Sequence, residues 1–112
     1  MFKATGWVAG QESFATIETP VRGRMRAAGH IGGRESYAVI SRVNTKEWRI
    51  SGSIGGYESH GTITQTGKDE WKAWGRLCGR DSIITLTKIY DGQWRLSEET
   101  GVNKVMMTVR RS

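Results

Sequence analysis

Apolar and polar residues alternate with a period of two through most of this chain. The clearest stretch covers residues 48–55 and reads WRISGSIG, and a second run, residues 59–65, is rich in Thr and Ile. A period of two places successive side chains on opposite faces of a strand, so these runs predict β-strands with one apolar face. No segment combines a helical period with helix caps. The pattern therefore predicts an all-β protein.

The alternating pattern recurs every 23 residues. The motif Gly10-Gln11-Glu12-Ser13 returns at residues 33–36, 56–59 and 79–82, the last with Asp in place of Glu. Self-similarity at a fixed period is typical of a chain built from one repeated supersecondary unit. We divide the chain into hairpin repeats 2–24, 25–47, 48–70 and 71–93 and a degenerate repeat 94–112. In the degenerate repeat Val105 replaces the expected Ser and Glu98 the expected Gly.

Each repeat contains two predicted strands joined by a glycine-rich turn, which gives about ten strands in an antiparallel meander. Glycine suits the positive φ angles of a tight hairpin turn. Pairing Gly55 with Glu58 across the turn sets the predicted register. The predicted partners on the apolar face are Ile54–Ser59, Gly52–Gly61, Ile50–Ile63 and Trp48–Gln65. The same rule predicts the pairs Trp7–Phe14, Lys3–Glu18 and His30–Tyr37.

A sheet of about ten strands with one apolar face has to cover that face. Closure into an up-and-down barrel covers it and removes the sheet edges, provided that the pairing shifts by two residues per repeat. Without the shift the sheet stays open and needs a partner. We expect a closed or flattened barrel. Small residues at mid-height leave either a small cavity or a pinched interior with aromatic rings over the glycines; they are Gly6, Ala15, Gly29, Ala38, Gly52, Gly61 and Gly75.

Length and composition limit the possible classes of function. The 112 residues fit a single domain, residues 1–112. The single cysteine excludes a disulfide framework within the chain and a Cys-rich zinc site. Because no long apolar run and no signal-peptide-like stretch occurs, we expect a cytoplasmic protein without a membrane span. The net charge of +6 favours encounter with polyanions.

One cation per repeat recurs on the predicted solvent face, together with aromatic residues such as Phe14 and His30. Cations neutralise phosphates and aromatic rings stack on bases, a combination typical of proteins that bind single-stranded nucleic acid. The alternative is a solvated basic surface whose long side chains cover the sheet. The predicted polyanion-binding residues are Lys3, Arg26, Arg49, Lys72, Arg95, Trp7, Tyr37, Trp74 and Arg76.

The Glu-Ser motif at the hairpin turns is a second candidate site. Repeated carboxylates, hydroxyls, arginines and a tyrosine at one end of the sheet could bind a glycan at several equivalent positions. The alternative is turn chemistry, in which these side chains bond to the backbone. The residues of this predicted rim are Glu12, Ser13, Arg34, Glu35, Ser36, Tyr57, Glu58, Ser59, Arg80, Asp81 and Ser82.

No pattern indicates an enzyme. Carboxylates in equivalent environments would not have the separated pKa values that acid–base catalysis needs. His30 and His60 are expected about three strands apart without a further ligand, so neither a metal nor another cofactor is predicted. Cys78 lies next to a turn and near Asp81, and a neighbouring carboxylate does not activate a thiol.

The sequence therefore predicts a non-enzymatic binding protein for a polyanion, with single-stranded nucleic acid or another phosphate-bearing ligand favoured. A multivalent, lectin-like module that uses the Glu-Ser rim is the alternative. A structural array that forms homo-oligomers through its apolar face or edge strands is a further possibility.

Overall fold

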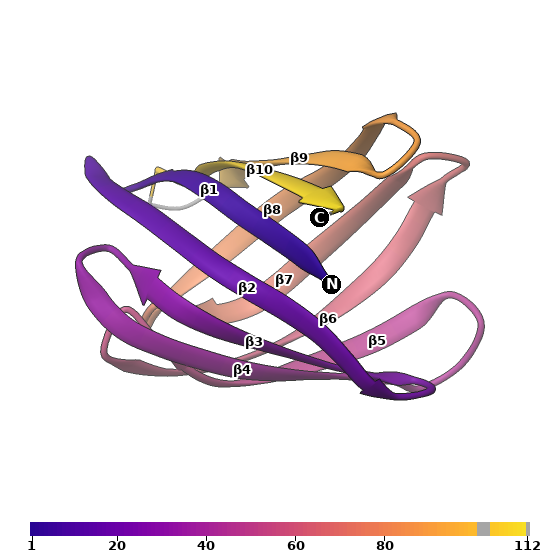
Figure 1. Ribbon diagram of the computed structural model, residues 1–112. Helices are drawn as coiled ribbons and strands as arrows, with labels where there is room; N and C mark the ends of the chain where they lie inside the picture. The colour runs from indigo at the N-terminus through magenta and orange to yellow at the C-terminus, as the bar shows by residue number, and fades with distance from the viewer. Residues whose placement is uncertain (101–103, 112) are drawn as a thin grey trace.

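The computed structural model describes residues 1–100 and 104–111, which form a closed antiparallel barrel of ten strands (Figure 1). The strands follow one another in chain order, and β1 closes the barrel by pairing with β10. The predicted all-β meander and its closure are confirmed. The turn of the fifth repeat, residues 101–103, and Ser112 lie outside the described residues. The strands are β1 (Phe2–Val8), β2 (Gln11–Val21), β3 (Arg24–Ile31), β4 (Arg34–Arg42), β5 (Glu47–Ile54), β6 (Tyr57–Gly67), β7 (Glu70–Leu77), β8 (Arg80–Tyr90), β9 (Gln93–Thr100) and β10 (Met106–Arg111).

The turns inside the first four repeats each consist of two residues with positive φ. Gly55 and Gly56 have φ angles of 66° and 86°, and Cys78, which is not a glycine, has 56°. Positive φ at both central residues is the geometry of a type I′ turn, whose twist matches that of the flanking strands. These turns gather at the end of the barrel on the left of Figure 1, called the turn end below. The connections between repeats lie at the opposite end, the linker end.

The predicted pairing within the hairpins is wrong by two residues. Ile54 pairs with Tyr57 rather than Ser59, and Gly52 pairs with Ser59 rather than Gly61. The prediction centred the turn on Gly56 and Tyr57, but the two consecutive glycines accommodate both positive φ angles and therefore form the turn. Because a shift of two residues preserves the alternation of sides, every side chain keeps its predicted face. In the same way the observed pairs are Ile50–Gly61, Trp48–Ile63, Trp7–Glu12, Lys3–Thr16 and His30–Glu35.

The pairing shifts by two residues between successive repeats, as closure was predicted to require. Ala15 pairs with Ala4 of its own hairpin and with Gly29 of the next repeat. Gly29 is the equivalent of Gly6, which lies two positions beyond Ala4. The same shift recurs at Ala38, Gly61, Ile84 and Met107. A constant shift tilts the strands and allows the sheet to meet its own first strand.

The glycines equivalent to Gly6 permit close approach of the strands where successive repeats meet. A Cβ atom on Gly52 would lie 2.2 Å from the carbonyl oxygen of Tyr37, and one on Gly29 would lie 2.1 Å from that of Phe14. No side chain fits at these distances. Glu98 occupies the same column in the fifth repeat, and there the β8–β9 register is interrupted by a bulge that leaves Glu99 as the extra residue.

The main buried apolar cluster lies around the seam between the first and last repeats. It contains Ala4, Val8, Val105, Met107 and Val109. Phe2 and Trp94 pack against this cluster, with their ring centroids 5.4 Å apart in an edge-on arrangement. Burial of this apolar surface stabilises the β1–β10 contact that closes the barrel.

Buried serines connect neighbouring turns at the turn end. The Ser36 hydroxyl donates a hydrogen bond to the carbonyl oxygen of Arg34 (3.0 Å) and accepts one from the amide of Gly55 in the next turn (2.8 Å). Ser13 and Ser59 make the equivalent pairs of bonds, reaching the amides of Gly32 and Cys78. The hydroxyl of Ser82 donates a hydrogen bond to the Glu98 carboxylate (2.8 Å). We call this chain of contacts the serine ladder.

Substitution of Ser59 by Ala should destabilise the barrel by about 1–3 kcal/mol, because the amide of Cys78 would lose its partner. Urea unfolding measures this change. The control is Ser51→Ala, which removes an exposed hydroxyl from β5 and should change the free energy of unfolding by less than about 0.5 kcal/mol. Equal stability of the two variants would contradict a structural role for the ladder.

Substitution of Gly52 by Ala should lower the free energy of unfolding by about 1–3 kcal/mol or more, because the added Cβ atom would overlap the carbonyl oxygen of Tyr37. Gly67→Ala is the matched control, because a Cβ atom there would lie 3.7 Å from the Cβ of Glu70, an ordinary contact. Thermal unfolding of both variants tests the difference. Similar melting temperatures would show that the glycine column is not required for close strand packing.

Candidate functional site

Closure of the barrel distributes the five repeated cations around its outside. Lys3, Arg26 and Arg95 lie on β1, β3 and β9, which occupy one half of the barrel with β10 and β2. Arg49 on β5 and Lys72 on β7 lie on the other half. The structure therefore brings together some of the predicted polyanion-binding residues and separates them from the others. Trp7 on β1 lies with the first group, Tyr37 lies on β4 next to that half, and Trp74 and Arg76, both on β7, lie with the second group.

A row of exposed side chains crosses five neighbouring strands near the turn end. Met106 pairs with Trp7 across β10 and β1, and Phe14 pairs with His30 across β2 and β3. Trp7–Phe14 and His30–Tyr37, predicted as direct pairs, are diagonal neighbours. The exposed fractions of Phe14, Trp7, Tyr37 and Met106 run from 52% to 67%, and His30 is also exposed. We call Met106, Trp7, Phe14, His30 and Tyr37 the exposed row.

The exposed row is long enough to contact an extended ligand. Four strand spacings give it a length of about 19 Å. The rings of Phe14 and His30 lie 5.2 Å apart between centroids with an interplanar angle of 33°, so they present neighbouring tilted surfaces. A contiguous exposed patch of large side chains typically marks an interaction site.

A line of cations runs beside the exposed row, and the two lines share β10, β1 and β3. Lys3 pairs directly with Arg110 across β1 and β10, and Arg95 is a diagonal neighbour of Arg110. Like charges opposite one another destabilise a sheet. Among the described residues, no carboxylate forms a salt bridge with Lys3 or Arg110. We call Arg95, Arg110, Lys3 and Arg26 the cation line; on β2, between Lys3 and Arg26, it is interrupted by Glu18, which pairs across the strands with Arg26.

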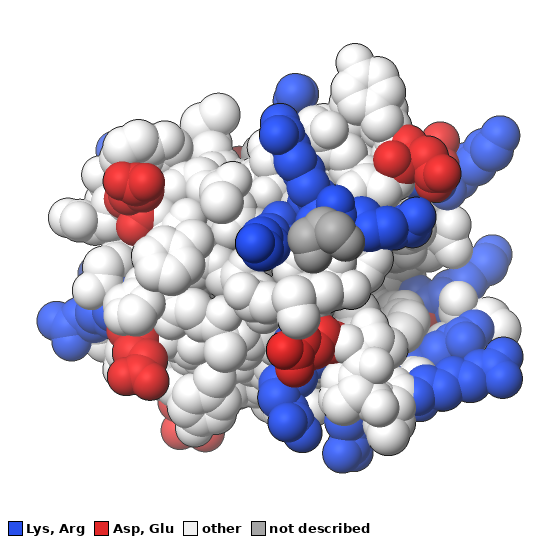
Figure 2. Space-filling view, viewed as in Figure 1, with Lys and Arg blue, Asp and Glu red and all other residues white. Residues whose placement is uncertain are grey.

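Small residues separate the exposed row from the cation line. On β10, β1 and β3 the two lines are four residues apart, a distance of about 13 Å; on β2 the residue four positions from Phe14 is Glu18. The residues halfway between them are Thr108, Thr5, Thr16 and Ala28. In Figure 2, positive side chains gather over the middle and the linker end of this side of the barrel, with acidic side chains among them, and the turn end carries mostly uncharged side chains together with acidic ones. The result is a shallow strip with one cationic and one largely aromatic border.

Sequence reasoning did not select Met106 and Arg110 as site residues. Both lie in the degenerate repeat, where the column pattern no longer identifies the solvent face. The local alternation of exposed and buried positions along β10 is the one signal that could have identified them. Their position next to Trp7 and Lys3 depends on closure between the two ends of the chain.

On the opposite half of the barrel, the cation Lys72 already has a carboxylate partner. Lys72 Nζ lies 3.0 Å from Glu99 Oε2, and the hydroxyl of Thr85 also donates to this carboxylate (3.0 Å). These hydrogen bonds and the charge of Lys72 lower the pKa of the Glu99 carboxyl. The Lys72 charge is thus partly neutralised within the protein. Arg76 pairs across the strands with Asp81.

The predicted Glu-Ser rim does not form one surface. Because side chains alternate along a strand, the acidic residues Glu12, Glu35, Glu58 and Asp81 lie on the outer face. The serines Ser13, Ser36, Ser59 and Ser82 are at most 5% exposed and belong to the serine ladder. The residues that precede the acids, including Arg34, Tyr57 and Arg80, line the mouth of the barrel.

Cys78 also lies at the mouth of the barrel. Its thiol is partly buried, and burial together with the negative charge of Glu98 raises the pKa of the Cys78 thiol. The carboxylate that acts on this thiol is Glu98 rather than Asp81, which is on the outer face. A protonated thiol is a poor nucleophile at neutral pH.

Comparisons with known proteins supply no relative. No protein-family model matches the chain, and no curated protein or solved structure is similar enough to it to indicate a relationship. Within the described residues, no cluster of His, Cys, Asp and Glu side chains is suited to hold a metal ion. No helix in that part of the chain is long and apolar enough to cross a membrane. Function is therefore argued from the surfaces themselves.

Alkylation of Cys78 by iodoacetamide should follow a pH profile displaced to higher pH than that of the urea-unfolded chain, because the folded-state pKa is raised. Because the pKa of the thiol is higher in the folded state, the free energy of unfolding falls as the pH rises from the thiol pKa of the unfolded chain toward that of the folded protein. Glu98→Gln should move the profile back toward lower pH, whereas Glu99→Gln, on the outer surface, should not. A folded profile at lower pH than the unfolded one would contradict this assignment.

Proposed function

We propose that this protein is a non-enzymatic binding protein for single-stranded nucleic acid, which lies across the outside of the barrel from β9 to β4. The observation that carries the proposal is the exposed row running beside the cation line, with which it shares β10, β1 and β3. Lys3 and Arg110 lie directly opposite each other without a salt-bridge partner among the described residues, which favours an anion between them.

The two borders of the strip have separate roles in this proposal. Arg95, Arg110, Lys3 and Arg26 neutralise phosphates and release the counterions condensed on them. Trp7, Phe14 and Tyr37 stack on bases, each contributing about 1–3 kcal/mol. The hydroxyls of Thr5, Thr16 and Thr108 lie between the borders and supply hydrogen bonds to the backbone of the ligand. Because every base has a stacking surface, this mode predicts little sequence preference.

The other expectations from the sequence receive less support. The acids and serines of the proposed glycan-binding rim lie on different sides of their strands, so a glycan cannot contact them together. Barrel closure pairs the edge strands β1 and β10 with each other. Self-association would therefore have to use the exposed row, in competition with the nucleic acid.

Binding of a fluorescein-labelled oligonucleotide of about twelve nucleotides should be detectable by anisotropy and weaken between roughly 50 and 200 mM salt. Arg110→Ala should reduce the log–log salt slope by about 0.7, the contribution of one phosphate contact on a single strand. Arg76→Ala is the matched control, because it removes an exposed arginine from β7 on the opposite half of the barrel. Equal slopes for the two variants would reject the cation line as the phosphate contact.

Two tryptophan variants test the stacking border in the same assay. Trp7→Leu should weaken binding about five-fold or more, because it removes one stacking ring. Trp74→Leu removes an exposed ring from β7 and should leave the affinity unchanged. Equal losses in both variants would contradict the placement of the strand. Absence of binding by the unaltered protein at the lower salt concentration would reject the proposed function.

A further inference from the structure

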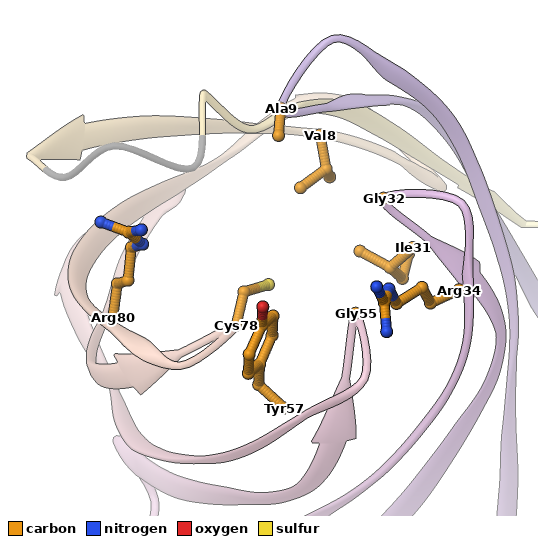
Figure 3. Close-up of a pocket in the computed structure, with 9 residues that line it drawn as sticks. All are labelled: Val8, Ala9, Ile31, Gly32, Arg34, Gly55, Tyr57, Cys78 and Arg80. Carbon is orange, nitrogen blue, oxygen red and sulfur yellow. The ribbon is translucent and has the colours of Figure 1, made fainter.

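A cavity of about 370 Å³ opens at the turn end, inside the ring of hairpin turns (Figure 3). This volume lies within the range of small-molecule sites. Val8 and Ile31 contribute apolar side chains to it, and Cys78 directs its sulfur toward the centre. The small residues at mid-height were expected to leave either a small cavity or a pinched interior there, and the observed cavity lies closer to the turns.

Two arginines reach this cavity from opposite sides. Arg34 at the start of β4 and Arg80 at the start of β8 occupy equivalent positions, on the same side of their strands as the buried Ser36 and Ser82. Neither guanidinium makes a hydrogen bond or an ion pair with another described residue. Two exposed cations that line one partly enclosed space repel each other, and a bound anion would offset this repulsion.

The following turns position the polar side chains at the mouth. Arg34 lies along Gly56, where an added Cβ atom would come within 2.8 Å of Arg34 Cδ. Tyr57 lies over Gly79 in the same way, at 3.0 Å from such an atom. Glycine at the second turn position therefore provides the space in which each of these side chains rests, and the Tyr57 hydroxyl points toward the cavity (Figure 3).

The acidic group nearest to the Cys78 side of the mouth already has partners. Glu98 accepts a hydrogen bond from the Ser82 hydroxyl (2.8 Å) and another from the Lys104 amide (2.7 Å). The repeated acids at the turns lie on the outer face. The carboxylates of the protein thus leave both arginines available to a ligand.

We propose that the mouth of the barrel is a second binding site, for a small organic dianion such as a dicarboxylate. One anionic group pairs with Arg34 and the other with Arg80, because the planar guanidinium fork matches a carboxylate with two parallel hydrogen bonds. The carbon skeleton lies against Val8 and Ile31, and the Tyr57 hydroxyl donates a hydrogen bond to the ligand. This site is separate from the outer surface and does not depend on nucleic-acid binding.

Cys78 reports on occupancy of this site, because it is the only cysteine of the chain and lines the cavity. Its alkylation rate would be measured with succinate, glutarate or adipate, and with acetate at the same ionic strength. The expected result is at least a five-fold slower reaction at saturation with the best-fitting dicarboxylate and no saturable effect of acetate. Equal protection by acetate, or none by any of the three dicarboxylates, would overturn the proposal.

Variants at the mouth test whether the dicarboxylate that slows Cys78 alkylation binds at the two arginines. Arg34→Gln and Arg80→Gln should each raise the half-saturating dicarboxylate concentration at least ten-fold, with protection expressed as the ratio of rates with and without ligand. Arg22→Gln at the linker end removes the same charge and should leave that concentration unchanged. Undiminished protection in the Arg34→Gln/Arg80→Gln double variant would overturn the site. Oligonucleotide binding by the double variant should equal that of the unaltered protein, which distinguishes this proposal from the proposed function.

Discussion

The barrel depends on the close contact between successive repeats at the glycine column. Gly6, Gly29, Gly52 and Gly75 let their strands approach the neighbouring backbone so closely that no Cβ atom fits. The two-residue shift in pairing occurs at these junctions, and it tilts the strands until β10 meets β1. Closure in turn buries the apolar cluster around that seam and removes the edges of the sheet.

The degenerate fifth repeat changes this symmetry in a coordinated way. Glu98 replaces a glycine, and the adjacent bulge accommodates its side chain. Its carboxylate accepts the hydrogen bond of Ser82, the last serine of the ladder, while Val105 replaces the serine of the fifth repeat. The extra residue, Glu99, pairs with Lys72 on the outside. One local irregularity thereby places the Glu98 carboxylate at the last serine of the ladder and the Glu99 carboxylate beside Lys72 on the outer surface.

The period of two assigns different tasks to consecutive residues of one motif. In Arg34-Glu35-Ser36 the arginine lines the mouth, the glutamate lies outside and the serine joins the ladder. The acid lies on the outer face in each of these repeats, and the serines of the first three repeats make equivalent hydrogen bonds. The mouth position changes from Arg34 to Tyr57 to Arg80, and this variation gives the cavity its two opposed cations and a phenol. Variation at one position of a repeated framework is thus sufficient to build an asymmetric site.

The sequence by itself determined the repeat, the strands, the apolar face and the need for closure, because alternation and a 23-residue period are local properties of the chain. It also identified most of the arginines and aromatic residues of both candidate sites, although not Arg110. The tertiary structure decided which of them lie together. The turn position depended on which glycines adopt positive φ, and the neighbourhood of Trp7, Met106, Lys3 and Arg110 depended on contact between the two ends of the chain. Such contacts arise from the stagger accumulated over all five repeats, which no single segment of the sequence contains.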